Sequence, residues 1–312
     1  MATSRKPASV NQRDLRETRL PDFLGIGTTR GGSSWLYRVL SRHPEVWMPP
    51  VKELHYFDRP MDGHRTVAFA RRELLIRARD YLIGERKRST ADTLRQTLRW
   101  DAHYLFTPRS LHWYRNLFRP REGQLTGEVT PAYAILDSAR VDAIAELMPD
   151  IKAIYILRNP IDRAWSSVVN SLARKRRRNI TTIPAQQVMR KAESVSRSAR
   201  SDYAANVRRW RAAIGHQRLF IGYMEEIKAD PEQLMQRICG FLGIGLPDDQ
   251  VRRTMLERVN TTSKFSAPMP PEVRRRVAEL LLPKIEDQAA LFGGYAEQWL
   301  EDARRAASGT SG

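Results

Sequence analysis

A loop rich in glycine and hydroxyl side chains follows an apolar run near the start of the chain. In GIGTTRGGSSWLYRVL, residues 25–40, two adjacent glycines are followed by Ser33 and Ser34. Consecutive backbone N–H groups at the start of a helix bind a phosphate, and the helix dipole favours the anion. An ordinary P-loop has a lysine directly after its last glycine, whereas here the cation is Arg30, before the glycine pair. The loop therefore predicts a phosphate site unlike that of an ATP-binding protein.

A second set of phosphate-binding side chains lies in LRNPIDRAWSS, residues 157–167. Arg158 directly follows an apolar run, and Ser166 lies eight residues later. A guanidinium at a strand end makes bidentate contacts with a phosphate, and a hydroxyl one or two helical turns on completes the site. The alternative for Arg158 alone is a surface or ion-paired arginine, but its spacing from Ser166 favours a second phosphate site.

Together these stretches resemble the sulfotransferases that use 3′-phosphoadenosine 5′-phosphosulfate (PAPS). The first is similar to their 5′-phosphosulfate loop and the second to their 3′-phosphate signature. KELHYFD, WYRNLF and GEVTPAYA, at residues 52–58, 113–118 and 127–134, resemble the branch that modifies glycans. The resemblance covers most of residues 22–300 and is weak between the motifs. It implies sulfuryl transfer from PAPS to a hydroxyl or amine, with adenosine 3′,5′-bisphosphate (PAP) as the product.

The resemblance also implies which residues bind the donor. The loop would hold the 5′ phosphate through Arg30, Gly31, Gly32, Ser33, Ser34 and Trp35, and the 3′ phosphate would lie on Arg158 and Ser166. Lys264 is a weaker candidate for the 3′ phosphate. Arg30 stands where the family has a lysine. Because arginine keeps its proton, we expect Arg30 to act as a fixed charge in catalysis and not as a proton donor.

The segment KELHYFD holds the candidate bases. By resemblance Glu53 is the base that deprotonates the acceptor, unless it is an exposed carboxylate paired with Lys52. His55 is the competitor, since imidazole titrates near neutrality and residues two apart in an extended strand point the same way. Lys52, Glu128 and Tyr133 are candidates for contact with the acceptor, and a purely structural role is the equal alternative for the last two. No histidine and cysteine cluster has metal-ligand spacing, so no metal is expected.

The acceptor and two other functions stay open at this point. A carbohydrate, a glycolipid or another small molecule would each suit the family resemblance. A P-loop-type small-molecule kinase would have a similar topology, although the G-K-[ST] ending is absent. A non-enzymatic protein that binds anions through the basic run RKRRR is the other alternative, although such runs are more often solvated surface.

The elements that must position these residues alternate between strand and helix. Apolar runs at 21–27, 151–157 and 218–227 predict strands, and each is followed by an amphipathic helical pattern. This order predicts an α/β fold: a P-loop-like, doubly wound parallel sheet flanked by helices, in a single domain with helical insertions.

Less regular segments divide the chain further. Residues 1–20 form a polar leader that we expect to be flexible, and the sulfotransferase domain is expected over 21–302. Within it, 60–110 is predicted as an insertion and 174–202 as a basic, mobile surface segment, and 303–312 as a disordered tail.

Composition limits the environment and the partners. Among 312 residues no run of about 18 apolar residues occurs, so no transmembrane helix is expected. The single cysteine, Cys239, lies in an apolar run and fits a buried position and a reducing cytoplasm. The net charge of +18 suggests an anionic partner. No nucleic-acid-binding module is present, so no specific nucleic acid is expected. Peripheral contact with a membrane and the oligomeric state stay open.

Overall fold

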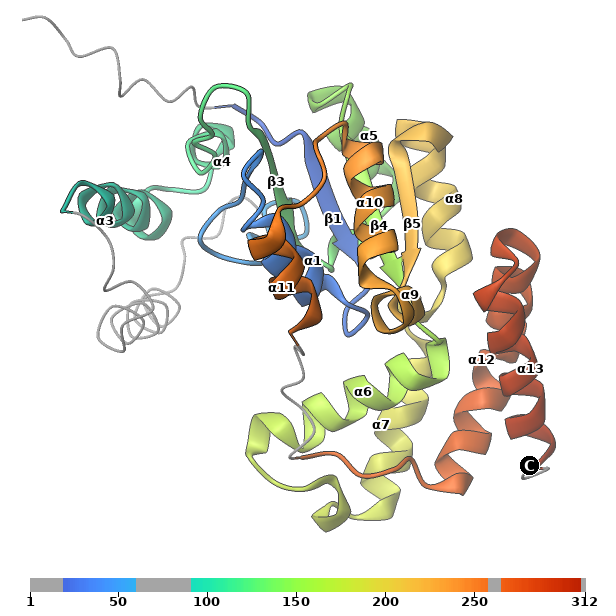
Figure 1. The fold of residues 1–312 in the computed structure, drawn as a ribbon. Coiled ribbons are helices and arrows are strands. Elements are labelled where there is room, and N and C mark those ends of the chain that lie inside the picture. The colour runs from blue at the N-terminus through green and yellow to red at the C-terminus, as the bar shows by residue number, and fades with distance from the viewer. Residues whose placement is uncertain (1–18, 60–90, 258–264, 310–312) are drawn as a thin grey trace, which may run out of the picture.

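A five-stranded parallel sheet forms the centre of the protein (Figure 1). The computed structural model describes residues 19–59, 91–257 and 265–309. The strands are β1 (Phe23–Gly27), β2 (Val46–Trp47), β3 (Leu125–Val129), β4 (Lys152–Leu157) and β5 (Leu219–Tyr223). Their order is β2-β3-β1-β4-β5. The chain moves from β1 to one side and later crosses to β4 on the other, which confirms the predicted doubly wound sheet.

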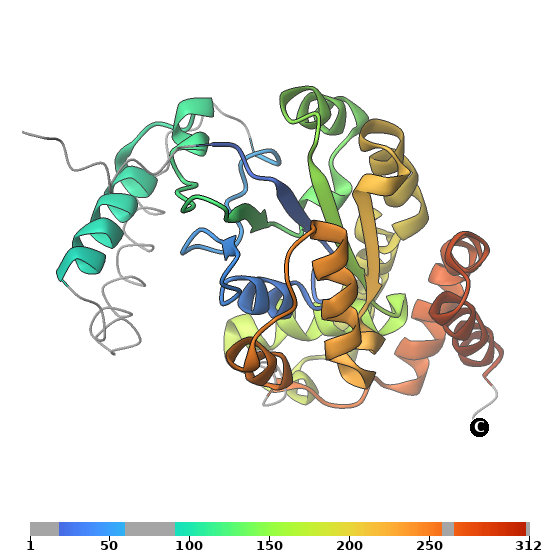
Figure 2. The ribbon, with the colours of Figure 1, turned by 45° about the horizontal axis from the view of Figure 1, so that its top comes forward.

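Helices lie on both faces of this sheet and beyond its two edges. They are α1 (Ser33–Leu40), α3 (Ala91–Phe106), α4 (Leu111–Arg115), α5 (Ser138–Leu147), α6 (Pro160–Leu172), α7 (Ala185–Arg197), α8 (Tyr203–Ile214), α9 (Met224–Ala229), α10 (Pro231–Leu242), α11 (Asp249–Leu256), α12 (Pro271–Phe292) and α13 (Tyr295–Ser308). Figures 1 and 2 show α3 and α4 beyond the β2 edge and the α12–α13 hairpin on the opposite side.

Two of the apolar cores lie on opposite faces of the sheet, because successive residues of a strand point to opposite faces. On β4, Ile154 and Ile156 pack in one core with α1, α10 and α11, whereas Ala153, Tyr155 and Leu157 pack in the other with α5, α6, α8 and α12. Every one of these β4 side chains is fully buried. Burial on both faces explains why the sequence of this strand is continuously apolar.

Side chains that start the helices agree with the sequence patterns. Asn159 caps α6 by accepting hydrogen bonds from Ile161 N and Asp162 N, and Pro160 stands at the first helical position. Asp230 caps α10 in the same way, with Pro231 after it. These caps satisfy N–H groups that a helix leaves unpaired at its start.

The structure corrects the predictions for two segments of the chain. Residues 174–202 were expected to be mobile, but they include α7, whose Val188 and Ala192 are buried against α6 and α12. The spacing of four between these small apolar residues is a helical signal that the many charges obscured. The disordered tail was placed at 303–312, whereas α13 continues to Ser308 and buries Ala303.

Other expectations fall partly on residues outside the description. Of the insertion at 60–110, only 91–110 is described, and it contributes α3 and the turn before α4. Strand β3 was not predicted, because LTGEV has large apolar residues only at its two ends and so forms no continuous apolar run.

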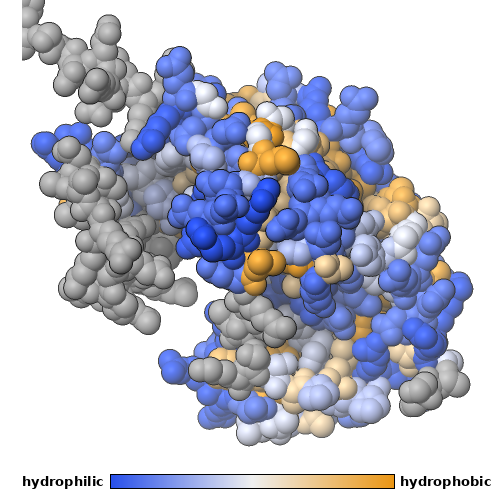
Figure 3. Space-filling model, viewed as in Figure 1, coloured by the Kyte–Doolittle hydropathy of each residue, from blue (hydrophilic) through white to orange (hydrophobic). Residues whose placement is uncertain are grey.

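The outer surface is mainly polar. In the space-filling view of Figure 3 the hydrophobic residues lie in small, separate patches on the face that carries α1, α10 and α11. Among the described helices, none combines the length and the apolar character that a membrane span requires.

Gly127 tests the packing between β1 and β3. It lies directly opposite Phe23, and a Cβ atom at this position would be 2.4 Å from the Phe23 ring. We expect Gly127→Ala to lower the free energy of unfolding by about 1–3 kcal/mol, since the buried ring cannot move without strain. Urea unfolding measures the change. The control is Gly240→Ala at an exposed position of α10, where a Cβ has open space, and a gain of about 0.5–1 kcal/mol is expected there. A Gly127→Ala protein as stable as wild type would contradict this packing.

Candidate functional site

The loop at the carboxyl end of β1 is held in a shape that opens α1. Thr28 N donates to Ile156 O at 2.7 Å, which ties the loop to β4, and Gly31 N donates to Thr28 O at 3.0 Å. Gly32 has φ 105°, which favours glycine, and no side chain caps the helix that follows it. A Cβ at Gly31 would be 2.3 Å from the Thr28 side chain. The two glycines are therefore required by the loop, which leaves the N-terminal end of α1 open to an anion.

Both predicted phosphate motifs meet at this loop. Arg30 Nε donates to Ser166 Oγ at 3.0 Å, and Arg158 Nη1 donates to Arg30 O at 2.9 Å. Lys52 Nζ lies 3.2 Å from Ser33 Oγ and 3.1 Å from Ser34 Oγ. Residues 128 and 136 positions apart in sequence thus converge at the carboxyl ends of β1 and β4, where doubly wound sheets bind ligands.

Two more arginines approach the loop, and the sequence motifs did not identify them. Arg200 Nη1 donates to Thr29 Oγ1 at 3.0 Å. The pKa of Arg30 is lowered first by burial and then by the charges of Arg174 and Arg158, which places both guanidinium groups near it. Arg174 and Arg200 come from the basic segment 174–202. Only its charge pointed to an anion, and charge alone does not say which of its many arginines approach the loop.

The side chains present suit a phosphate-bearing donor. The Arg158 Nε atom is buried without a hydrogen-bond partner in the described structure, although a buried polar atom ordinarily has one. Within the described residues neither Arg158 nor Arg174 forms an ion pair with a carboxylate. Guanidinium, ammonium, hydroxyl and free amide donors together make a site for anionic oxygens. No group of three or more metal-ligating side chains occurs in the part of the chain that is described.

The segment with the candidate bases is not an extended strand. Strand β2 ends at Trp47, and Glu53 and His55 both have positive φ values, 66° and 56°. The geometric reason for expecting parallel side chains was therefore wrong, yet the two still meet, with His55 Nε2 3.4 Å from Glu53 Oε2. Lys52 Nζ is 3.3 Å from Glu53 Oε1. Glu53 thus lies between two cationic groups.

Hydrogen bonds set opposite charges on Glu53 and His55. Burial lowers the pKa of His55, but hydrogen bonds to Asp58, with Nδ1 to Oδ2 at 2.8 Å, and to Glu53 outweigh burial and raise it to about 9. Burial raises the pKa of Glu53, but the bonds from His55 and Lys52 outweigh it and lower this pKa to about 2. At neutral pH His55 is therefore protonated and cannot take a proton, whereas Glu53 is an ionised carboxylate. This assignment favours Glu53 over His55 as the base.

Glu128 and Tyr133 lie beneath this segment in the core. Both are at most 1% exposed. The Glu128 carboxylate accepts from Tyr114 Oη at 2.6 Å, Tyr133 Oη at 2.9 Å and Thr130 Oγ1 at 2.7 Å. The pKa of Glu128 is raised, because the effect of burial outweighs that of the three hydroxyl bonds, which lower it. This placement favours the structural alternative for both residues.

The same network supports the segment that carries the candidate base. Tyr133 Oη accepts from Tyr56 N at 2.9 Å, and Glu53 N donates to Val129 O at 3.1 Å. Arg109 also donates to His55 O. Lys264, the remaining donor-site candidate, lies outside the described residues, so its role stays a prediction.

Comparison with known proteins identifies the family. The family model described as "Sulfotransferase family" matches residues 21–248, well over half of the chain. The chain therefore belongs to the sulfotransferase family, and the resemblance seen in the motifs is confirmed. The matched region contains both phosphate motifs and all five strands of the sheet.

Curated relatives agree with this membership. Human heparan sulfate glucosamine 3-O-sulfotransferase 3A1 is 24% identical over 237 residues, which is 74% of this chain and 46% of that protein. The mouse 3-O-sulfotransferase 6 is 28% identical over 157 residues, 50% of this chain and 32% of that protein. The chain thus matches about a third to a half of the length of these relatives.

Solved structures share the fold. A sulfotransferase from Alicyclobacillus acidocaldarius superposes with a TM-score of 0.62 at 25% identity, covering 89% of this chain and 98% of that one. The mouse sulfotransferase SULT7A1 complexed with PAP has a TM-score of 0.50 at 14% identity, covering 92% and 90%. This second likeness shows the fold alone.

The Glu53–His55–Asp58 contacts predict a pH dependence of stability. A raised His55 pKa stabilises the fold fully below about pH 6.5, and this contribution is lost as pH rises through about 9. The lowered Glu53 pKa contributes above about pH 4.5 and is lost as pH falls through about 2. The melting-temperature difference between wild type and His55→Gln is therefore expected to be largest near pH 6 and to shrink by pH 9.5. In an NMR titration, Asp58→Asn should lower the His55 pKa. A wild-type His55 that titrates near 6.5 would refute the assignment.

Proposed function

We propose that this chain transfers a sulfuryl group from PAPS to a hydroxyl or amine of an acceptor. The observation that carries the proposal is the position of Lys52. Its ammonium group contacts the hydroxyls of Ser33 and Ser34 in the phosphate loop and also the carboxylate of Glu53. One side chain thus joins an anion site to a base, which is the arrangement that group transfer from an anionic donor requires.

Two groups of side chains would hold the donor. Arg158 and Ser166 would bind its 3′ phosphate, and the N–H groups of residues 32–35 would bind its 5′ phosphate together with the hydroxyls of Ser33 and Ser34. When bound, PAPS supplies a sulfuryl group already bonded to a phosphate leaving group. Arg30 holds a permanent positive charge beside Ser166. Fixed cations at this place stabilise negative charge without having to reorganise.

Glu53 would take the proton from the acceptor at its carboxylate. Its side chain is 41% exposed, so an acceptor can reach it. His55, held by Asp58, orients the carboxylate through Nε2. Displacement of Lys52 or His55 by the acceptor would raise the Glu53 pKa from its low value, because those two contacts are what lowers it. The base would then become stronger when the acceptor is in place.

The acceptor class is part of the same proposal. The two relatives described above are named for sulfation of heparan sulfate glucosamine, which supports a carbohydrate or glycolipid acceptor for this chain. Another small metabolite is the remaining choice.

Cys239 is buried and unpaired in the described structure, in keeping with a protein of the reducing cytoplasm.

Binding of PAP tests the donor site directly. At 100 times its Kd, PAP should stabilise the fold by about 2.7 kcal/mol, seen as a rise in melting temperature, whereas ADP and ATP should give smaller rises. Arg158→Ala should lose the response. The control, Arg218→Ala, removes an exposed arginine at the amino end of β5 and should keep it. A larger response to ATP than to PAP would move the small-molecule kinase to the front.

Substitution of Glu53 tests the base. We expect Glu53→Gln to lower kcat/KM for sulfation of any accepted hydroxyl by about 10²–10⁴-fold, since general-base catalysis contributes about this much. PAP affinity should stay close to wild type, because Glu53 does not contact the phosphate motifs. Transfer of radioactive sulfate from labelled PAPS measures the rate. A greater loss in His55→Gln than in Glu53→Gln would assign the proton to the histidine.

A further inference from the structure

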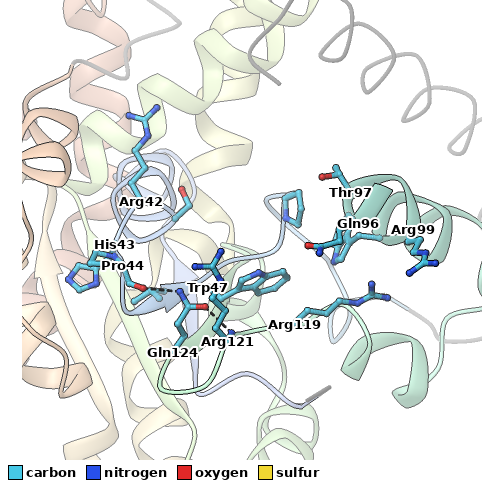
Figure 4. Close-up of a pocket in the computed structure, with 14 residues that line it drawn as sticks. Arg42, His43, Pro44, Trp47, Gln96, Thr97, Arg99, Arg119, Arg121 and Gln124 are labelled. Carbon is cyan, nitrogen blue, oxygen red and sulfur yellow. Dashed lines mark hydrogen bonds between the residues drawn. The ribbon is translucent and has the colours of Figure 1, made fainter. Parts of the chain in front are cut away.

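Arg163 places a positive charge inside the protein. Figure 4 shows Arg42, Arg99 and Arg121 around a groove beyond β2, and all three are exposed to solvent. Arg163 on α6 is only 1% exposed. Because a guanidinium keeps its proton, α6 carries a buried positive charge. Removing a charge from water is costly unless its surroundings compensate it.

The groups that Arg163 contacts are neutral. Its Nη2 donates to Ser201 Oγ at 2.6 Å, and its Nη1 lies 3.5 Å from Ser167 Oγ, at the limit of a hydrogen bond. Its Nε atom is buried and has no hydrogen-bond partner in the described structure. In the part of the chain that the structure describes, no carboxylate forms an ion pair with Arg163. The two serine hydroxyls accept hydrogen bonds but do not neutralise the charge.

Arg163 lies close to the 3′-phosphate motif. Along the chain it stands between Arg158 and Ser166, the two residues that would bind this phosphate. The buried Tyr203 donates from Oη to Arg158 O at 3.0 Å. Burial raises the pKa of Tyr203 to about 12, although the charges of Arg163 and Arg158 lower it. Both guanidinium groups are therefore near the same phenol.

The contact with Ser201 brings Arg163 close to the 5′-phosphate loop as well. The next residue, Arg200, donates from Nη1 to Thr29 Oγ1 in that loop at 3.0 Å. Ser201 is fixed by two more neutral groups: its Oγ donates to Val195 O at 3.2 Å, and its carbonyl accepts from Gln288 Nε2 at 2.9 Å. Through Ser201, the Arg163 charge is held beside the segment that contacts the loop.

One carboxylate, Glu225, also lies near Tyr203. Its Oε1 accepts from Asn159 N at 3.2 Å and from Trp299 Nε1 at 3.0 Å. Its Oε2 is buried without a hydrogen-bond partner in the described structure, so it does not bind Arg163. A carboxylate without direct contact offsets the Arg163 charge only in part, because the attraction weakens with distance.

We propose that Arg163 is a buried countercharge for the donor, and that the phosphates of PAPS or PAP balance its charge when they bind. The inference rests on the proposed function, because it requires an anion with several charges in the site. Arg163 has almost no surface for the donor to contact, so it acts through the electric field that it adds to those of Arg30 and Arg158. Because Arg163 is buried, salt screens its attraction less than that of an exposed arginine.

Opposite effects on stability and on binding would distinguish this role. Arg163→Met removes the charge but keeps an unbranched side chain, and Ser201 Oγ retains Val195 O as a partner. We expect the melting temperature without ligand to equal or exceed that of wild type, since apolar replacement of a buried charge is often neutral or stabilising. The Kd of PAP, measured by calorimetry, should rise at least about tenfold. A purely structural role predicts a lower melting temperature and an unchanged Kd.

Two further variants separate charge from structure and buried charge from surface charge. Arg163→Lys keeps the charge and should retain most of the affinity that Arg163→Met loses. Arg99→Met removes one exposed charge from the groove of Figure 4, and the Kd of PAP should stay within about twofold of wild type. The ratio of Kd values between Arg163→Met and wild type should persist at high salt.

The outcomes distinguish this inference from the proposed function. Absence of PAP binding in wild type would overturn both. Binding in wild type with an unchanged Kd in Arg163→Met would overturn the countercharge alone. An equal loss of affinity in Arg163→Met and Arg163→Lys would assign the effect to the Ser201 hydrogen bond and not to the charge. An Arg163→Met protein that does not fold would show that the fold itself requires the arginine, which also contradicts the proposal.

Discussion

The concentration of like charge at the carboxyl end of the sheet is the constraint on which the rest of the structure depends. Arg30, Arg158 and Arg174 are close enough for the latter two to lower the pKa of the first. Like charges that approach in a half-buried site repel, so the arrangement persists only because backbone and hydroxyl groups hold it. The Arg158 contact to Arg30 O and the Arg30 contact to Ser166 provide that support. An anion with several charges would reduce this repulsion between the arginines. The repulsion therefore favours binding of such an anion.

The C-terminal hairpin contributes to the same site from outside the range of the family model. Asn159, next to Arg158, donates to Asp302 on α13 at 3.2 Å, and Arg274 on α12 binds that carboxylate at 2.7 Å. Trp299 Nε1 donates to Glu225 Oε1 at 3.0 Å, and Asn159 N donates to the same oxygen at 3.2 Å. The turn that presents Arg158 is thus clamped by side chains from α9, α12 and α13. The family model ends at residue 248. Arg274, Trp299 and Asp302 therefore support the turn from outside the region that the family model matches.

A buried carboxylate gives equivalent support to the opposite side of the site. Glu128 and its three hydroxyl donors form a network with few unsatisfied groups, and Tyr133 extends it to the backbone of Tyr56. Such networks are rigid, because breaking one bond leaves a polar group buried without a partner. The segment from Glu53 to Asp58 has two residues with positive φ, and this network is what holds it in that unfavourable conformation.

The sequence by itself determined three strands of the sheet, β1, β4 and β5, and the two phosphate motifs, because each rests on local chemistry. An apolar run, a glycine turn and an amphipathic helix are read within about 20 residues, and the contacts of Arg30, Arg158 and Ser166 follow from where such elements end. Only the tertiary structure decided the charge states of Glu53 and His55, since these depend on how close Lys52 lies to Glu53 and Asp58 lies to His55. It also turned Arg174 and Arg200 toward the loop and buried Glu128. Contacts between residues distant in sequence leave no periodic pattern, so one sequence alone cannot reveal them.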